Sequence, residues 1–177
     1  GLRIDMYDIS DDGLFKIDIL SSRALAQLYD ALGDDAKHIQ FDNPPFTDEM
    51  KALFASGNNL GITLAESPLC RSEFKCIQPK CVEDVAKCLA LIRPAARESE
   101  GNIIYDDDAI EIIAEEVGCS EAQADAYRRG LAKKDRSIVH DITSTIGSQR
   151  LQQLQLKLSS LNQYGFCKAH AMSYAQL

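Results

Sequence analysis

The sequence predicts a mainly α-helical fold with one or two short β-strands near its N-terminus. Several segments carry apolar residues at three- and four-residue spacing, and most of them follow a residue type that caps helices. Residues 14–20 instead alternate loosely between Asp12-Gly13 and Ser21-Ser22, which favours a short strand. The chain has 177 residues, of which 45% are hydrophobic. It can therefore bury one substantial core, and we expect one domain, or one domain with a piece of another.

The first two helices are predicted from the residues at their ends. Ser21 or Ser22 can cap a helix that runs to about Leu32 and ends at Gly33. Its expected apolar face consists of Ala24, Leu25, Leu28 and Leu32. An extended loop follows at Asn43-Pro44-Pro45. Thr47, with two acidic residues after it, then predicts the start of a helix that Gly57 closes.

Two helices are expected in the centre of the chain. Pro68 can occupy the first turn of one of them, which would hold Leu69, Phe74 and Ile77. The segment 82–92 is strongly amphipathic, and we expect Pro94 to stop its helix. The predicted apolar stripe of this second helix consists of Val82, Val85, Leu89 and Ile92.

The last third of the chain is also predicted to be helical. Asp106-Asp107-Asp108 begins a helix to Val117, and Ser120 caps another that runs to about Lys134. We expect an irregular region near Gly147. After it, a leucine stripe at three- and four-residue spacing predicts one helix of about three turns rather than a coiled coil. The stripe consists of Leu151, Leu154, Leu158 and Leu161.

The charge balance argues against a free-standing nucleic-acid-binding domain. The formal net charge is −8 and the sequence pI is about 4.9, whereas such domains are usually basic. An acidic balance still permits a local basic strip. The sequence has one at Arg128, Arg129, Lys133 and Lys134.

The cysteines and the apolar runs predict a cytoplasmic protein that does not enter a membrane. The six cysteines contain no C-x-x-C pair and no zinc-type spacing, so we expect reduced and mostly buried thiols. No apolar run approaches the roughly 20 residues that span a bilayer, and no secretory signal is visible. Both ends enter an element without a start or stop signal, so we expect a fragment of a longer polypeptide.

The strand segment Gly13–Leu25, G-L-F-K-I-D-I-L-S-S-R-A-L, is the first of several motifs that resemble the bacterial C-family DNA polymerases, the family of the DNA polymerase III alpha subunits. The motifs occur in the family's order as far as Ala175. The resemblance implies that Asp18 is a catalytic, metal-binding carboxylate of the palm and that Lys16 faces the incoming nucleotide. Strand side chains alternate, so Lys16 and Asp18 would share a face. The alternative is a carboxylate at a solvated sheet edge.

Two interior motifs extend the resemblance and supply cations. The segment 82–94, V-E-D-V-A-K-C-L-A-L-I-R-P, is similar to a helix of the family. Near its end, Arg93 either faces the nucleic acid or complements the helix dipole. The segment 124–134, A-D-A-Y-R-R-G-L-A-K-K, resembles the family's paired arginines. This second match implies that Arg128 and Arg129 contact the phosphates of the incoming nucleotide, with Lys133 and Lys134 beside them. The alternative is a solvated basic face paired with Asp125 or Asp135.

Two further motifs resemble the family but depart from its pattern. The chain has R-P-A-A at residues 93–96 where the family has R-P-G-P, and the connection that follows is shorter than the family's insertion. Tyr105 then begins Y-D-D-D where the family has Y-Q-E-Q. The acidic triplet either suits a helix N-terminus or binds a metal ion. The segment 164–175, Y-G-F-C-K-A-H-A-M-S-Y-A, resembles the family's Y-G-F-N-K-S-H-A-A-A-Y-A. There we expect His170 to be a buried, hydrogen-bonding scaffold residue and Lys168 to touch the DNA backbone.

The resemblance implies a fragment of a DNA-directed DNA polymerase, with residues 1–20 at the end of the palm sheet and 21–177 forming a helical fingers-type domain. It implies Mg²⁺ as cofactor, primer-template DNA and deoxynucleoside triphosphates as partners, and contacts with other replisome subunits. The other catalytic carboxylates are expected outside this chain, so the fragment alone should be inactive. Two alternatives are a degenerate, non-enzymatic helical module that binds nucleic acid or a protein, and an unrelated cytosolic all-α domain.

Overall fold

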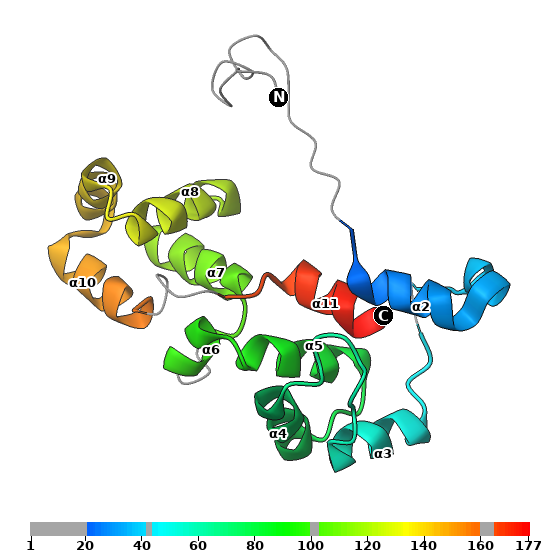
Figure 1. The fold of residues 1–177 in the computed structure, drawn as a ribbon. Helices are drawn as coiled ribbons and strands as arrows, with labels where there is room; N and C mark the ends of the chain where they lie inside the picture. The colour runs from blue at the N-terminus through cyan, green and yellow to red at the C-terminus, as the bar shows by residue number, and fades with distance from the viewer. Residues whose placement is uncertain (1–20, 42–43, 100–102, 160–164) are drawn as a thin grey trace, which may run out of the picture.

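The computed structural model describes residues 21–41, 44–99, 103–159 and 165–177, and every regular element in these ranges is helical (Figure 1). The mainly α-helical prediction is therefore confirmed. The predicted N-terminal strands fall on residues 1–20, outside the described ranges. The elements are α2 (Arg23–Leu32), the 3₁₀ helix η1 (Gly33–His38), α3 (Asp48–Ser56), α4 (Pro68–Ile77), α5 (Val82–Leu91), α6 (Pro94–Glu98), α7 (Asp106–Val117), α8 (Glu121–Ala132), α9 (Arg136–Ile146), α10 (Ser148–Lys157) and α11 (Lys168–Gln176).

The predicted helix starts are confirmed by hydrogen bonds from the backbone to hydroxyl caps. Ser22 Oγ accepts from the N–H of Leu25 at 3.3 Å, and Thr47 Oγ1 accepts from that of Met50 at 3.3 Å. Ser67 and Ser120 cap α4 and α8 in the same way. Each cap satisfies a backbone donor that the helix itself cannot pair, which is why the sequence fixes these boundaries locally.

The structure adds two short helices to the predicted elements and corrects one prediction. The 3₁₀ helix η1 follows α2 directly. Pro94 follows the end of α5 but is also the first residue of the short helix α6, because proline suits the first turn of a helix. The region before Gly147 is the helix α9, and α10 starts at the next residue.

Helices α7 to α10 form one lobe around their own core. The buried side chains of Ile113, Ile142 and Leu154 lie at its centre, together with those of Leu151 and Leu158 from the predicted leucine stripe. The full buried set is Ile103, Ala109, Ile113, Ala124, Tyr127, Ile142, Leu151, Leu154 and Leu158. This arrangement confirms the inward-facing stripe of α10, apart from Leu161, which lies outside the described residues.

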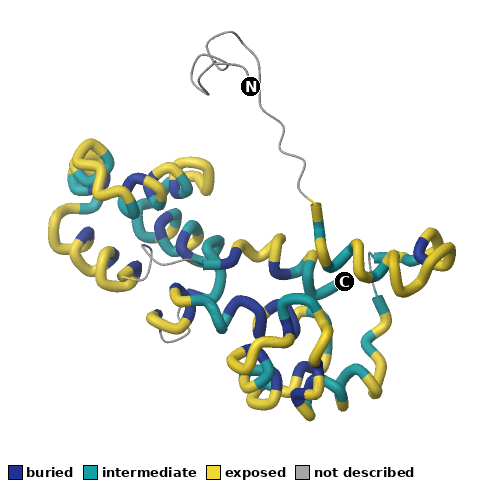
Figure 2. The backbone as a smooth tube through the Cα atoms, in the orientation of Figure 1, coloured by how far each residue is buried: buried dark blue, intermediate teal, exposed yellow. Residues whose placement is uncertain are grey.

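Helices α3, α4, α5 and α11 form the second lobe. The rings of Phe54 and Phe74 stack with their centroids 4.7 Å apart, and Val85 and Leu89 of the predicted α5 stripe are buried against them. Helix α11 returns from the end of the chain to pack along α5 (Figure 1). Buried alanines of α5 then meet Phe166 and Ala171, so the two segments share a third small core. Figure 2 shows the buried backbone stretches concentrated in these two lobes.

Helix α2 lies at the margin of the second lobe. Its predicted apolar residues share a face, but none of its residues is buried, and Tyr29 and Leu32 are 46% and 40% exposed. All six cysteines are free, yet only Cys70 and Cys88 are buried, so the expectation of mostly buried thiols is wrong. None of the described helices is long and apolar enough to cross a membrane.

Candidate functional site

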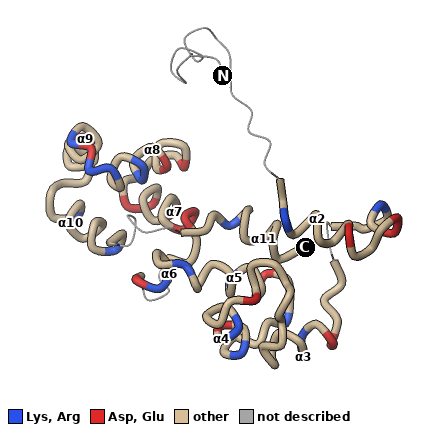
Figure 3. The backbone as a smooth tube through the Cα atoms, viewed as in Figure 1, with Lys and Arg blue, Asp and Glu red and all other residues tan. Residues whose placement is uncertain are grey.

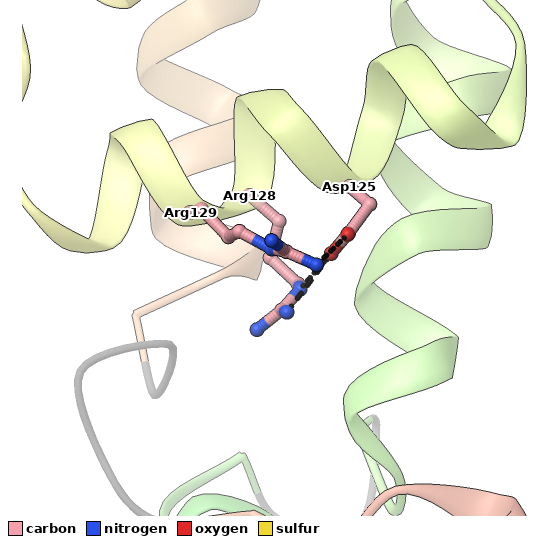
Figure 4. Close-up of polar contacts among 3 residues, drawn as sticks. All are labelled: Asp125, Arg128 and Arg129. Carbon is pink, nitrogen blue, oxygen red and sulfur yellow. Dashed lines mark hydrogen bonds and ion pairs between the residues drawn. The ribbon is translucent and has the colours of Figure 1, made fainter. Parts of the chain in front are cut away.

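The paired arginines of α8 share one carboxylate. Arg128 donates from Nε and Nη2 to Asp125 Oδ1 at 3.1 and 2.9 Å, and Arg129 Nη2 lies 2.5 Å from Asp125 Oδ2 (Figure 4). The Arg128 side chain is 23% exposed and that of Arg129 is 68% exposed. Of the two carboxylates considered as partners, Asp125 therefore pairs with the arginines, whereas Asp135 caps α9. The guanidinium groups of Arg128 and Arg129 therefore lie next to each other, and both are bonded to the Asp125 carboxylate, the anchor of the pair.

The anchor carboxylate is held in its charged form. Burial of Asp125 raises its pKa, but the hydrogen bonds and charges of Arg128 and Arg129 outweigh burial and place the pKa below its ordinary value. The two guanidiniums thus keep their counterion throughout the neutral pH range.

The two lysines that follow the arginines occupy the end of α8. Lys133 is the C-cap residue of the helix, and Lys134 adopts a left-handed backbone conformation with φ of 55°. Both are exposed, and neither contributes to the Asp125 cluster. The four predicted cations of this motif are therefore divided between the middle of α8 and the turn after it.

The acidic triplet at the start of α7 makes structural contacts. Asp108 Oδ2 accepts from the backbone N–H groups of Ile104 and Tyr105 at 2.8 and 2.9 Å, which forms the N-terminal cap. Asp107 Oδ2 accepts from the N–H of Lys168 at 2.6 Å and so caps α11. The triplet thus joins the N-termini of α7 and α11, although they lie about sixty residues apart in sequence.

Asp106 links this junction to the arginine pair. Its backbone N–H donates to Phe166 O at 3.1 Å, and its carboxylate lies so close to Gly165 that a Cβ at that position would collide with it. Burial raises the pKa of Asp106, while the charge of Arg128 lowers it in part. The charge of Arg128 therefore acts on the Asp106 carboxylate, which lies beside Gly165.

The corner at the start of α11 carries a stack of rings. His170 lies between Phe166 and Tyr174, with both centroid distances at 5.0 Å, and the guanidinium of Arg93 lies 4.4 Å from the centroid of Phe166. His170 is exposed, so the prediction of a buried histidine is wrong, although Phe166 before it is buried and Tyr174 after it packs against the core. Lys168 is exposed beside it.

Arg93 also lines a pocket that sequence reasoning missed. The pocket has a volume of about 620 Å³ and includes Arg23, Glu66 and Tyr174 among its lining residues. Arg93 follows α5, and the pocket lies where the start of α2, residues 61–67 and α11 meet it. Arg93 thus lines a cavity and lies over the Phe166 ring, and its contact with nucleic acid stays a prediction. The spacing of four between Phe166, His170 and Tyr174 could have revealed the ring stack beside it.

The structure places the predicted site residues in three groups. Arg128 and Arg129 form the first, the lysines at the end of α8 form the second, and Arg93 lies with the aromatic corner and Lys168. Tyr105 is half-buried at the junction, where burial and the charge of Asp108 raise the pKa of its phenol. Asp18 and Lys16 lie outside the described residues.

Comparisons with known proteins give a consistent result. Residues 22–101 match the family model of the bacterial DNA polymerase III alpha subunit finger domain. Similar curated proteins are DNA polymerase III subunits alpha from Staphylococcus epidermidis (28% identity over 207 residues, 93% of this chain and 19% of the relative) and Thermotoga maritima (26% over 204 residues, 98% of this chain and 23% of the relative). The subunit from Staphylococcus aureus strain MRSA252 is 28% identical over 93% of this chain. The chain spans about a fifth of the length of these relatives.

Proposed function

We propose that this chain, which matches the finger-domain model of bacterial DNA polymerase III alpha subunits over residues 22–101, forms the fingers, and at residues 1–20 the adjoining palm edge, of a DNA-directed DNA polymerase. In this proposal it works in the cytoplasm within a larger polypeptide and its replisome partners. Its substrates are primer-template DNA and deoxynucleoside triphosphates. The family match to residues 22–101 and the relatives that align with most of the chain support this proposal.

The arginine pair of α8 is the observation that carries the role of this chain. Two guanidiniums on one helix face, held by one carboxylate, present several N–H donors to an approaching anion. The bonds to Asp125 use Nε and Nη2 of Arg128, so they leave its Nη1 for another acceptor. Guanidinium forks match phosphate oxygens in geometry and charge. Arg128 and Arg129 would therefore hold the triphosphate of the incoming nucleotide.

We propose that Mg²⁺ binds to residues outside the described ranges. Among the described residues, no group of three His, Cys, Asp or Glu side chains could hold a metal ion. The donors of the described part thus do not fit a two-metal site, and we place the ions on Asp18 together with carboxylates outside this chain. When bound there, two Mg²⁺ ions would activate the primer hydroxyl and stabilise the leaving oxygens. Lys16 would lie on the same face and approach the triphosphate.

The contribution of the arginine pair can be tested in the full polypeptide. Each charge-assisted hydrogen bond is worth about 1.5–3 kcal/mol, so Arg128→Ala/Arg129→Ala should raise the KM for deoxynucleoside triphosphates by roughly tenfold or more. The matched control is Arg150→Ala/Lys157→Ala, because these two cations also share one carboxylate, Glu116, in the same lobe. An unchanged KM in the first variant, or an equal rise in the control, would contradict the phosphate-binding role.

Primer extension tests the catalytic assignment. The full polypeptide should extend a primer, its Asp18→Ala variant should not, and the 177-residue chain alone should not. Template-dependent incorporation by the chain alone would show that the remaining carboxylates are not needed. A fully active Asp18→Ala variant would show that Asp18 does not hold the metal ions.

A degenerate, non-enzymatic module remains the second candidate function. It is favoured by the net charge of −8 and by the acidic triplet, whose carboxylates contact protein backbone. Under that alternative, the full polypeptide would bind DNA or a protein partner but fail to extend primers under any condition.

A further inference from the structure

We propose that the turn between α8 and α9 is a docking surface for the sugar-phosphate backbone of duplex DNA, separate from the arginine pair. We call Lys133, Lys134 and Arg136 the basic turn. This inference deepens the proposed function, on which it rests for DNA as the ligand. It assigns the two lysines to the duplex rather than to the nucleotide, and it adds Arg136 from the next helix.

The cations of the basic turn are available to an outside anion. All three are exposed, and none forms an ion pair among the described residues. Other cations of the same lobe are paired internally: Arg128 and Arg129 with Asp125, and Arg150 and Lys157 with Glu116. Figure 3 shows Lys and Arg gathered where α8 passes into α9. In a chain of net charge −8, this surface carries a local excess of positive charge.

The one acidic residue within the turn, Asp135, is itself exposed, and its carboxylate bonds to Ser137. Asp135 Oδ1 accepts from the N–H of Ser137 at 2.9 Å and from its hydroxyl at 2.7 Å. These bonds lower the pKa of Asp135 and use its charge as the N-terminal cap of α9. The left-handed Lys134 reverses the chain immediately before it. The turn therefore presents three cations beside one ionised carboxylate, which caps α9 and on which the charge of Lys133 also acts.

The two helices that carry the turn are fixed against each other. A Cβ at Gly130 would lie 2.5 Å from Ile138 Cγ1, so the absence of a side chain lets α8 and α9 approach closely. The Tyr127 hydroxyl donates to Asp141 Oδ2 at 2.5 Å across the same pair. The basic turn is thus held by a rigid frame, which reduces the entropy lost when it binds.

The chemistry of the turn favours a duplex over a single strand. No Phe, Trp or Tyr occurs between Tyr127 and Tyr164, so the basic turn, α9 and α10 supply no aromatic platform on which unpaired bases could stack. Duplex DNA carries one charge per roughly 1.7 Å of helix axis and attracts cations without regard to sequence. The guanidiniums of Arg128 and Arg129 point back along α8 to Asp125, away from the turn (Figure 4).

The experiment measures binding of the chain to a fluorescent 20-base-pair duplex by anisotropy at several salt concentrations. The Lys133→Gln/Lys134→Gln/Arg136→Gln variant is compared with Lys80→Gln/Lys87→Gln/Arg97→Gln, which removes two lysines and one arginine that are also exposed, outside the α7–α10 lobe. We expect the basic-turn variant to bind more weakly and to lose about two to three units from the slope of log K against log salt. The control should keep the slope of the unmodified chain. Circular dichroism checks that all three proteins are folded.

Equal losses in the two variants would show that only net charge matters and would overturn the proposal. A turn-dependent interaction with single-stranded DNA but not with the duplex would overturn it as well. Nucleotide binding separates this inference from the proposed function. In the full polypeptide, the basic-turn variant should raise the KM for deoxynucleoside triphosphates less than Arg128→Ala/Arg129→Ala does. If the Arg128→Ala/Arg129→Ala variant keeps its KM while duplex binding still depends on the turn, the nucleotide role fails and the docking surface stands.

Discussion

Asp125 determines how the two arginines of α8 are presented. It is the only carboxylate in the described residues that pairs with both of them, and its geometry converts two flexible cations into one adjacent pair. A bare R-R sequence would not specify this arrangement, since long side chains at a surface adopt many rotamers. The carboxylate three and four residues earlier on the same helix supplies the constraint.

Acidification should release the arginine pair. Because the pKa of Asp125 is lowered in the folded chain, its contribution to stability is present above the unfolded pKa of about 4 and is lost as pH falls through the folded value. We expect the free energy of unfolding to fall between pH 7 and pH 3, and part of that fall to disappear in Asp125→Asn. Chemical denaturation at a series of pH values measures both. Parallel profiles for the two proteins would contradict the pairing.

At the scale of elements, the end of α8 and the start of α9 depend on a single missing side chain. Gly130 lies inside a helix, where alanine would ordinarily be favoured by about 1 kcal/mol. Here a Cβ would lie 2.5–2.9 Å from the branched side chain of Ile138, which cannot move aside easily.

We therefore expect Gly130→Ala to destabilise the fold by about 1–3 kcal/mol, the usual cost of overpacking, despite the gain in helix propensity. Urea denaturation measures this change. The cost should be smaller in an Ile138→Ala background, where the two methyl-bearing branches are gone. A stabilising Gly130→Ala substitution would show that the two helices are not in close contact.

The elements that the sequence predicts well are those with local causes. At four helix starts, a hydroxyl accepts a hydrogen bond from the backbone N–H three residues later, so each boundary depends on one short segment. These hydroxyls belong to Ser22, Thr47, Ser67 and Ser120. Helix α9 escaped prediction because its sequence, R-S-I-V-H-D-I-T-S-T-I, is rich in β-branched and hydroxyl residues with weak helix propensity. Packing of Ile142 and Ile138 in the lobe stabilises it instead.

The candidate site shows the same division. Asp125 could be foreseen as a partner of the arginines because the spacing is local. The contact of Asp107 with Lys168 could not be foreseen, because it depends on how α7 and α11 meet in space. The exposure of His170 likewise depends on which face of α11 packs on α5.

At the scale of the molecule, the two lobes have separate cores. Among the described residues, the α7–α10 core shares none with the clusters around α3–α5 and α11, whereas these latter clusters share Leu64, Tyr174 and Ala175. The backbone links between the lobes include the junction of the acidic triplet with residues 166 and 168. We therefore expect each lobe to unfold as a cooperative unit of its own.

Leu154→Ala should reveal this independence. The side chain is 1% exposed in the α7–α10 core, so its truncation should cost that lobe about 2–5 kcal/mol. Hydrogen exchange should accelerate in α7 to α10 and change little in α4 and α5. The reciprocal variant Phe74→Ala should reverse the pattern. Uniform acceleration throughout the chain by either variant would show one cooperative unit.

The packing of α11 along α5 has a consequence for synthesis on the ribosome. Helix α5 is made in the first half of the chain, yet Ala86 and Ala90 are covered by residues 166–175, which are translated about eighty residues later. The α7–α10 lobe contains only residues from 103 to 158 in its buried core, so it can close while α11 is still within the exit tunnel. The lobe that begins first along the chain is therefore the one that finishes folding last. Until then, Ala86 and Ala90 of α5 lack the side chains that cover them in the finished fold.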